Sequence, residues 1–502
     1  MKLRRVLGCY GVLFCLCQTS AKFSQSANEI PQAERRKIAI VGGGIGGTSC
    51  AYWLQKAAGD SIDIDLFNYG KIGGRIATAN VNGKRYEAGA SILHPENKYM
   101  AQWTEEFGLH KQDSPDGVGR MGIWNGHELV FEESDWRWVT FFRMMRRYGF
   151  DLLKLKFHIT DMLAKFSRIY RLQEQGNAFD STVELITAMS EDFTPQLNVT
   201  LRHFLKEKGY HDVFINELAS AAENCNYGQS SDELNAFVGS VGLAGAVPDL
   251  WAVHGGNFQI PQKLVEHSKA KVISAKVNHV AKTADGKYTI RATDENDNEM
   301  DASTEYDAVV LALPLVRDSL SLSVEGVDLN KHAGPYQQLI STFVRGSPRA
   351  EAWHKTAETM PDAILVSDTK LFYKSLGQWV DVDWSKGEPI PTTGTDRVWK
   401  VFSVEPLTNA QLKALFEVIE EKNEVRWLAY PRYPLHDVPK QPTFTLSHGL
   451  YHVNAIEWAA SAMEMSAIGG RNVALLVLRD FFGAKTTGGD HGASAAKPAT
   501  EL

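Results

Sequence analysis

The sequence of 502 residues predicts an α/β fold in which a βαβ unit is combined with an inserted, largely helical domain and a mixed α+β segment. Near the N-terminus, two short β-branched runs flank a glycine cluster and a helical pattern. Long helical patterns rich in Trp, Phe, Met and Arg follow from about residue 96 to residue 227. Strand-like sequence returns after residue 270, and a strand, a turn and a helix follow residue 449. This order is typical of a Rossmann-like domain whose pieces are separated by insertions.

The predicted domain boundaries follow these changes in pattern. The Rossmann-like domain takes its parts from residues 36–95, 245–320 and 441–480. Between them lie a mainly helical substrate domain, 96–244, and a mixed α+β part of the substrate domain, 321–440. The tail, 481–502, is rich in Gly, Ala, Thr and Lys and is expected to be disordered.

The N-terminus has the pattern of a secretory signal peptide, residues 1–21. A basic start is followed by an apolar run, 6–17, and by small residues up to Ala21. A membrane anchor is the alternative, but the run is shorter than the roughly 20 residues that cross a bilayer. The triplet that begins at Asn198 is an N-glycosylation acceptor, which agrees with a leader into the secretory pathway.

Composition and short motifs exclude several classes of function. The formal net charge is −7, which gives no basic footprint for nucleic acid. Removal of the leader would leave Cys50 and Cys225, too few for a disulfide framework. We find no G-x-S-x-G, no H-E-x-x-H and no usable C-x-x-C, so we expect no metal site and assign no catalytic residue.

The glycine cluster fits the dinucleotide pattern G-x-G-x-x-G. In this pattern Gly42 allows the tight turn, Gly44 lets the backbone approach a pyrophosphate and Gly47 packs the helix on the strand. The N–H groups of the helix that starts here would face an anion. We therefore expect Gly42, Gly44, Gly46 and Gly47 to bind the cofactor. The flanking βαβ elements are placed at 37–41, 48–56 and 62–67.

The second strand ends in Asn68, where the pattern calls for an acidic residue that holds the ribose hydroxyls. An amide oxygen also accepts a hydrogen bond, but a neutral bond is roughly half as strong as a charge-assisted one. Asp65 lies on the opposite face of the strand, because side chains alternate with period two. We expect Asn68 to take the ribose position.

Two further segments favour FAD over NAD. Residues 71–75 resemble the Gly-Gly-Arg loop of the flavin amine oxidase superfamily, which implies that Gly74 and Arg75 lie near the FAD phosphate and ribose. Residues 449–457 and the helix after them resemble the C-terminal flavin segment of that superfamily, which implies a contact from Glu457. The same resemblance implies a cofactor contact from Val277.

A second glycine-rich run, 239–245, has the wrong spacing and no preceding strand, so we expect no second nucleotide site. Without bound NAD(P)H, the electrons would come from the substrate and leave to oxygen. Tyr227, His254 and Asn257 lie near glycines and are candidates for lining the flavin cavity, although residues of this kind are more often structural, and we call none of them catalytic.

Several strings outside these motifs carry a closer resemblance: Tyr86–Ser91, Val130–Ser134, Asn226–Ser230, Trp427–Pro431 and Ala459–Ala467. They resemble the prenylcysteine oxidase family, and the resemblance extends from about residue 37 to 478. It implies FAD-dependent cleavage of S-farnesyl- or S-geranylgeranylcysteine with oxygen and water to a prenyl aldehyde, cysteine and hydrogen peroxide. It also implies a lysosomal setting, with secretion as the alternative.

Two other functions remain open: a flavin amine oxidase or desaturase for another apolar substrate, and a lipid-binding protein on a flavin fold without turnover. A prenyl tail requires an apolar tunnel, which the helical insertion would supply. Aromatic and basic residues interleave between Trp136 and Arg171. This stretch is either a membrane or lipid-particle contact or, as the simpler interpretation, an ordinary amphipathic helix.

Overall fold

The computed structural model describes residues 35–113, 119–245, 250–385, 394–436, 439 and 442–483. The predicted signal peptide and the chain after residue 483 lie outside the described residues. Within these ranges, every helix is too short or too polar to span a lipid bilayer.

The Rossmann-like domain is built on a six-stranded sheet with the order β20-β21-β13-β1-β2-β9. Neighbouring strands are parallel except β20 and β21. β1 is central, and Ile38 is in register with Ile64 of β2 and Ala308 of β13. The strands are β1 (Arg36–Val41), β2 (Ile62–Asn68), β9 (Lys271–Ser274), β13 (Ala308–Leu311), β20 (Thr445–Ser447) and β21 (Leu450–His452). The parallel sheet predicted from the β-branched runs is therefore present.

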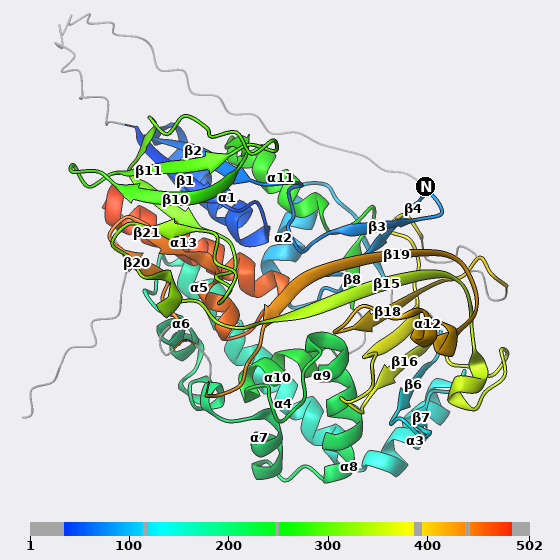
Figure 1. Cartoon of the computed structure of the whole chain (residues 1–502). Coiled ribbons are helices and arrows are strands. Elements are labelled where there is room, and N and C mark those ends of the chain that lie inside the picture. Colours follow the sequence, from blue (N-terminus) through cyan, green and yellow to red (C-terminus); the bar gives the residue numbers. More distant parts are fainter. Residues whose placement is uncertain are drawn as a thin grey trace, which may run out of the picture. The chain divides into compact units, whose positions relative to one another are not determined.

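The two faces of this sheet pack against different layers, as Figure 1 shows. Ile38 and Ile40 join the core beneath the helices α1 (Ile45–Ala58), α11 (Gln259–Ser268) and α13 (Met463–Phe482). Ala39 and Val41 alternate with them and join a separate core under a second sheet. That sheet has the order β12-β11-β10-β14 and consists of β10 (Lys276–Lys282), β11 (Tyr288–Thr293), β12 (Glu305–Tyr306) and β14 (Ser323–Val324). Burial on both faces explains the uninterrupted apolar sequence of β1.

Residues 96–244 form most of the helical part of the molecule. Its helices are α2 (Lys98–Glu106), α3 (Arg137–Tyr148), α4 (Asp151–Phe166), α5 (Arg168–Glu174), α6 (Thr182–Met189), α7 (Leu201–Glu207), α8 (Asp212–Phe214), α9 (Ser220–Tyr227) and α10 (Ala236–Ala244). A π-helical turn, Ile215–Ala219, joins α8 to α9. The second glycine-rich run, 239–245, begins within α10, where Gly239 faces Leu201. These glycines therefore serve helix packing.

A seven-stranded sheet, in the order β19-β15-β18-β17-β16-β6-β7, forms the mixed α+β part. Its strands are β6 (Met121–Trp124), β7 (Leu129–Glu132), β15 (Tyr336–Pro348), β16 (Ala363–Val366), β17 (Ser375–Gln378), β18 (Val398–Ser403) and β19 (Phe416–Pro431), with α12 (Asn409–Leu415) before the last strand. β6 and β7 come from the mainly helical segment. At four residues each, they are too short for a clear strand pattern in the sequence.

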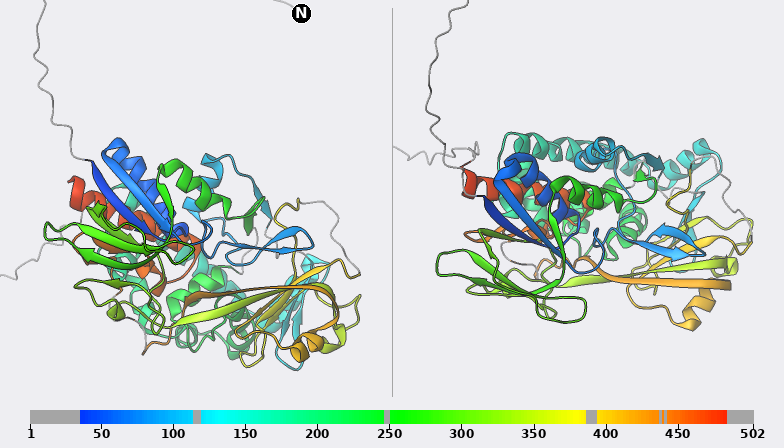
Figure 2. Two further views of the ribbon diagram at one scale, coloured as in Figure 1. Left: turned by 45° about the horizontal axis from the view of Figure 1, so that its top comes forward. Right: turned by 90° about the horizontal axis from the view of Figure 1, so that it is seen from above.

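The long strands β15 and β19 form an antiparallel ribbon that runs from the side of α13 to the far end of this sheet. In the right-hand view of Figure 2, the ribbon and the β10–β11 sheet lie along one side and most of the helices along the other. The short pairs β3 (Thr78–Val81) with β4 (Lys84–Glu87), and β5 (Lys111–Asp113) with β8 (Trp251–Val253), complete the fold. The ribbon thus reaches from the Rossmann-like domain to the seven-stranded sheet.

Candidate cofactor site

The glycine loop turns sharply from β1 into α1. Gly42 has φ +116° and its N–H donates to Phe67 O over 2.8 Å, which holds the loop against β2. A Cβ on Gly47 would overlap the carbonyl oxygen of Gly42, and a Cβ on Gly46 would lie 2.8 Å from Val453. A Cβ on Gly44, in contrast, would meet no protein atom within 4 Å. The backbone at Gly44 therefore faces open space, as a pyrophosphate approach requires.

Helix α1 begins at Ile45, three residues before the predicted start at residue 48. Its N-cap is Gly44, which has no side chain to satisfy the first N–H groups. α13 likewise begins after Ala462 without a side-chain cap. Two helix N-termini with uncapped N–H groups therefore start near the glycine loop, and such groups favour a phosphate.

Asn68 lies at the end of β2 and is buried beside the loop. Its Oδ1 accepts from the Gly43 N–H at 2.9 Å, and its Nδ2 donates to Gly70 O at 2.8 Å. Asp65 is directed elsewhere, since it accepts from the Tyr306 hydroxyl at 2.9 Å and pairs with Lys37. The predicted exclusion of Asp65 from the ribose position agrees with these contacts.

The Gly-Gly-Arg loop packs directly on the glycine loop. The Gly73 N–H donates to Gly43 O at 2.9 Å, and a Cβ on Gly74 would lie 3.4 Å from the Cα of Gly44. Gly73 and Gly74 have φ values of +120° and +57°, which favour glycine. The two loops therefore form one surface beside the space at Gly44.

Arg75 connects this surface to the C-terminal segment. Its guanidinium donates to Ala429 O at 2.6 Å and forms a bidentate pair with Glu457. Glu457 is fully buried, and its carboxylate also accepts from the Tyr336 hydroxyl at 3.0 Å and from Asn454 Nδ2 at 2.7 Å. Burial lowers the pKa of Arg75, but the Glu457 carboxylate raises it more, so the net shift is upward and the guanidinium stays charged.

The front and back of the chain meet at this point. Ser49 Oγ in α1 donates to Ala467 O in α13 at 2.9 Å, and Gly470 of α13 packs against Gly46 without room for a Cβ. The 3₁₀ helix Val453–Trp458 precedes α13 and carries Glu457. The expectation that the glycine loop and the C-terminal segment adjoin is confirmed.

Val277 lies on β10 and is buried in the same core as Val41 and Phe67. Two residues before it, the Ala275 N–H donates to Asn68 O at 3.3 Å, which places this strand beside the proposed ribose end. The loops with Gly42–Gly47 and Gly73–Arg75, together with Asn68, Val277 and Val453–Trp458, are called the cofactor cradle below. Its glycine surface, open space and uncapped helix ends fit a dinucleotide.

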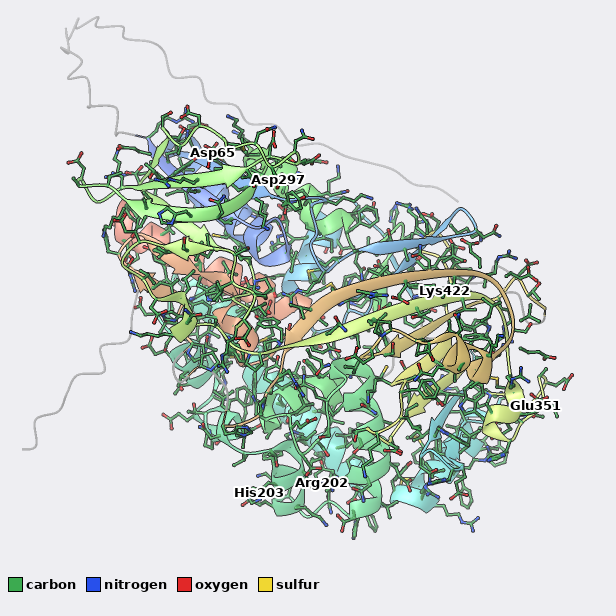
Figure 3. All side chains as sticks on the ribbon, viewed as in Figure 1. Asp65, Arg202, His203, Asp297, Glu351 and Lys422 are labelled. Carbon is green, nitrogen blue, oxygen red and sulfur yellow. The ribbon has the colours of Figure 1, made fainter. Side chains whose placement is uncertain are left out.

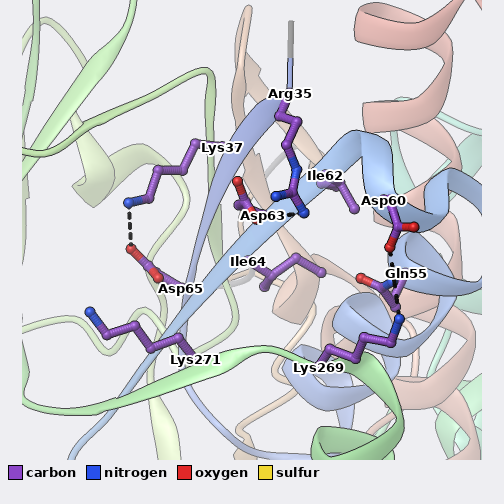
Figure 4. A pocket seen from close by; sticks show the side chains of 10 residues that line it. All are labelled: Arg35, Lys37, Gln55, Asp60, Ile62, Asp63, Ile64, Asp65, Lys269 and Lys271. Atoms are coloured by element: carbon purple, nitrogen blue, oxygen red, sulfur yellow. Dashed lines mark ion pairs between the residues drawn. The ribbon is translucent and has the colours of Figure 1, made fainter. Parts of the chain in front are cut away.

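Another hollow, shown in Figure 4, lies at the opposite end of the same strands. Lys37, Ile62 and Lys271 come from the first residues of β1, β2 and β9. Ligands of parallel sheets bind outside the carboxyl ends of the strands. The ion pairs of this hollow, including Arg35 with Asp63 at 3.0 Å, belong to the amino end. It is therefore not the cofactor site.

The three candidate lining residues have structural partners. Tyr227 donates to Ser461 O at 3.3 Å, and His254 Nδ1 lies 3.0 Å from Gln112 Oε1. Asn257 accepts from the Val253 N–H and donates to Ala90 O. Sequence reasoning did not find Tyr336 or Asn454 as partners of Glu457. No spacing rule could have found Tyr336, because it lies on β15, far from Glu457 in sequence.

The stretch between Trp136 and Arg171 exposes its aromatic side chains. The only buried residue of α3 is Tyr148. An ordinary amphipathic helix would bury its aromatic residues and expose its basic ones. Here Arg137, Arg143 and Arg146 are exposed as well. The aromatic surface, on α3, α4 and their ends, consists of Trp136, Trp138, Phe141, Phe142, Phe150 and Phe157, each more than 60% exposed.

Comparison with known proteins connects these features to a family. The sequence profile described as prenylcysteine lyase matches residues 131–490, and an NAD(P)-binding Rossmann-like profile matches residues 40–107. Prenylcysteine oxidase 1 of Mus musculus is 38% identical over 477 residues, covering 93% of each chain, and that of Homo sapiens is 39% identical, covering 88% of each. A triple mutant of putrescine oxidase shares the fold, with TM-score 0.56, 13% identity and coverage of 88% of this chain and 99% of that one. From its profile match and from its relatives over most of its length, the chain belongs to the prenylcysteine lyase family.

Proposed function

We propose that the protein is an FAD-dependent oxidase that cleaves the thioether of S-prenyl-L-cysteine with oxygen as electron acceptor. The observation that carries the proposal is the cofactor cradle, where the glycine loop meets the Arg75–Glu457 pair and the N-terminus of α13. The family membership supplies the substrate class. Farnesyl- and geranylgeranylcysteine are the expected substrates.

Bound FAD would supply the acceptor for a hydride from the carbon between sulfur and the alkene. The cradle residues would hold the cofactor: the backbone at Gly44 would admit the pyrophosphate, and Asn68 would contact the ribose. Asn68 is neutral and already bonded to Gly43 and Gly70. Its contribution to the ribose is therefore expected to be weaker than that of a carboxylate.

An absorbance spectrum of the purified protein tests the proposal. A flavin band that bleaches anaerobically on addition of S-farnesylcysteine, and returns with oxygen, is the expected result. Bleaching by a simple amine but not by S-farnesylcysteine would instead favour an amine oxidase. A colourless protein that still binds farnesylcysteine would point to a lipid-binding protein without turnover.

We also propose that the aromatic surface contacts a membrane or a lipid particle. Large exposed apolar patches on soluble proteins usually mark an interaction site. Helices with exposed aromatic and basic side chains are suited to lie in the interface of an anionic bilayer. A prenylated substrate partitions into lipid, so contact with lipid would bring the substrate domain to its source.

For the cellular setting we propose the secretory pathway with a lysosomal destination, and secretion as the alternative. Asn198 supports the proposal because its side chain is exposed. It lies shortly before α7, whose residues Arg202 and His203 are on the outside of the helical part in Figure 3. An N-glycan there would have access to solvent. Glycosidase treatment of the protein from a eukaryotic host should lower its apparent mass, and Asn198→Gln should abolish that change.

A further inference from the structure

A buried acid without a partner lies in the substrate domain. Glu223 of α9 is 0% exposed, and neither carboxyl oxygen has a hydrogen-bond partner among the described residues. Burial raises the pKa of this carboxyl well above its ordinary value. A buried polar group is normally satisfied, so an orphaned one indicates strain or a missing ligand.

The helix packing leaves room for this carboxyl. A Cβ on Gly242 of α10 would lie 2.6 and 2.7 Å from its two oxygens, so a larger residue there would force the carboxyl to move. A π-helical turn, Ile215–Ala219, immediately precedes α9. Such turns occur frequently at functional sites.

The same face of α9 leads to the cofactor cradle. Tyr227 lies one helical turn after Glu223 and donates to Ser461 O, in the segment that precedes α13. Its ring contacts that of Tyr430 with a centroid distance of 5.1 Å. Tyr430 follows Ala429, whose carbonyl accepts from Arg75. Contacts through Tyr227 and Tyr430 therefore connect Glu223 to the cofactor cradle.

Tyr430 provides a second orphaned polar group. Its hydroxyl is buried and has no hydrogen-bond partner among the described residues. Burial raises the pKa of this hydroxyl, and so do the neighbouring Cys225, Tyr227 and Glu223, which places Glu223 in its electrostatic surroundings. A neutral phenol can donate to an anion, and an ionised carboxyl can accept from a cation.

Other buried acids of the chain differ from Glu223. Glu464 accepts from the N–H groups of Tyr99 and Met100 and from the Tyr170 hydroxyl, so its oxygens serve the N-terminus of α2. Glu457 is bonded to Arg75, Tyr336 and Asn454. Burial by itself therefore does not leave an acid unpartnered in this fold.

We propose that Glu223 and Tyr430 hold the amino-acid head of the substrate, Glu223 accepting from the α-ammonium and Tyr430 donating to the α-carboxylate. The inference rests on the proposed function, because it takes the zwitterionic head from S-prenylcysteine. An ammonium has only donors and a carboxylate only acceptors, so this pair of orphaned groups complements both. The prenyl tail would extend from the head into the apolar core of the helical domain.

Glu223→Gln tests the ammonium contact, because it keeps the size of the side chain but cannot become negatively charged beside the ammonium. Two substrates are compared: S-farnesyl-L-cysteine and S-farnesyl-3-mercaptopropionate, which lacks the amine. For the variant, KM for S-farnesyl-L-cysteine should rise about tenfold to hundredfold, the effect of losing a bond to a charged group. KM for the des-amino compound and the flavin content should stay within about twofold, because neither depends on that bond.

Glu464→Gln is the matched control, since it neutralises an equally buried acid that has its own partners. It should leave the ratio of the two KM values unchanged. Tyr430→Phe is the second variant and retains the ring. It should raise KM for S-farnesyl-L-cysteine but not for its methyl ester, which lacks the carboxylate.

The outcomes are distinct. Equal changes of KM for both substrates in Glu223→Gln would overturn the ammonium contact. If Glu223→Gln loses its flavin, the proposal is tested with Tyr430→Phe by comparing KM for S-farnesyl-L-cysteine with KM for its methyl ester. Equal changes of the two KM values would overturn the head-group site. Failure of the proposed function itself would appear earlier, as wild-type flavin that S-farnesyl-L-cysteine does not reduce.

Discussion

Two buried carboxyl groups show how the cofactor side and the substrate side of the molecule differ. Glu457 in the cofactor cradle is fully buried and accepts from Arg75, Tyr336 and Asn454. Glu223 in the helical domain is equally buried but has no partner among the described residues. Since an unpaired buried polar group costs free energy, the first arrangement is complete by itself and the second is not. The cofactor side is held together by its own contacts, whereas the helical domain leaves polar groups unpaired, which we propose to be ligand contacts.

The glycine loop shows the same difference on a smaller scale. Gly42 and Gly47 are enclosed by backbone atoms, whereas the Cβ position of Gly44 is free of protein atoms. Substitution at Gly47 would therefore disturb the fold, but substitution at Gly44 would disturb only what binds there. Variants at these two glycines therefore separate cofactor binding from folding.

Gly44→Val should empty the cofactor site. Its Cβ would meet no protein atom within 4 Å, and the side chain would extend into the open space that the pyrophosphate needs. Flavin content, measured as the ratio of flavin to protein absorbance, should fall roughly tenfold or more, which corresponds to at least ~1.4 kcal/mol of binding free energy. Undiminished flavin would show that the cofactor does not pass Gly44.

Gly47→Ala is the contrasting control. Its Cβ would overlap the Gly42 carbonyl, so the free energy of unfolding should fall by about 1–3 kcal/mol, as for other overpacked sites. Chemical denaturation of the flavin-free proteins compares the two variants. A Gly44→Val protein that is destabilised as much as Gly47→Ala would remove the distinction between them.

Arg75→Leu should destabilise the folded protein by about 3–5 kcal/mol, because it leaves the Glu457 carboxylate buried without its cation. Tyr336 and Asn454 would still donate, which limits the loss. Adding Glu457→Leu should recover much of the stability, and denaturant unfolding measures both variants. If the single variant lost less than about 1 kcal/mol, the pair would behave like a surface salt bridge.

Much of the cofactor side could be predicted from the sequence, because its signals are local. The βαβ elements lie within three residues of their predicted bounds, and the glycine pattern fixes where β1 and α1 meet. The meeting of the two ends was predicted from resemblance. The partners of Glu457 were not, since Tyr336 reaches it only through the path of β15. Glu223 could not be recognised either, because its burial depends on how α10 packs on α9.

Substitutions on the aromatic surface test its proposed contact with lipid. Trp138→Ser together with Phe142→Ser should weaken binding to anionic phospholipid vesicles roughly hundredfold or more, because burying two large side chains contributes about 1.5–3 kcal/mol each. Flavin content and unfolding should hardly change, since both side chains are exposed. Vesicle co-sedimentation measures the binding. Wild-type protein that stays in the supernatant at low salt would reject lipid contact.

Glu464→Gln should change how the stability of the folded protein depends on pH. Burial raises the pKa of Glu464 to about 7, although the N–H groups of Tyr99 and Met100 and the Tyr170 hydroxyl lower it. Because the folded pKa exceeds the unfolded one, the contribution of this group is complete below about pH 4.5 and is lost as the pH rises to about 7. At ~1.4 kcal/mol per pKa unit, the loss amounts to at most about 3 kcal/mol.

Unfolding by urea at several pH values between 4.5 and 7.5 measures this dependence. The variant should show a flatter curve, with the largest deficit at acidic pH and a smaller one near neutrality. Some slope should remain, since burial raises the pKa of Glu87 to about 7 as well. Parallel curves for the two proteins would mean that Glu464 stays ionised throughout this pH range. The three hydrogen bonds that it accepts would then lower its pKa more than burial raises it. Glu464 would then be a permanently charged, satisfied acid, and the contrast with the unpartnered Glu223 would become sharper.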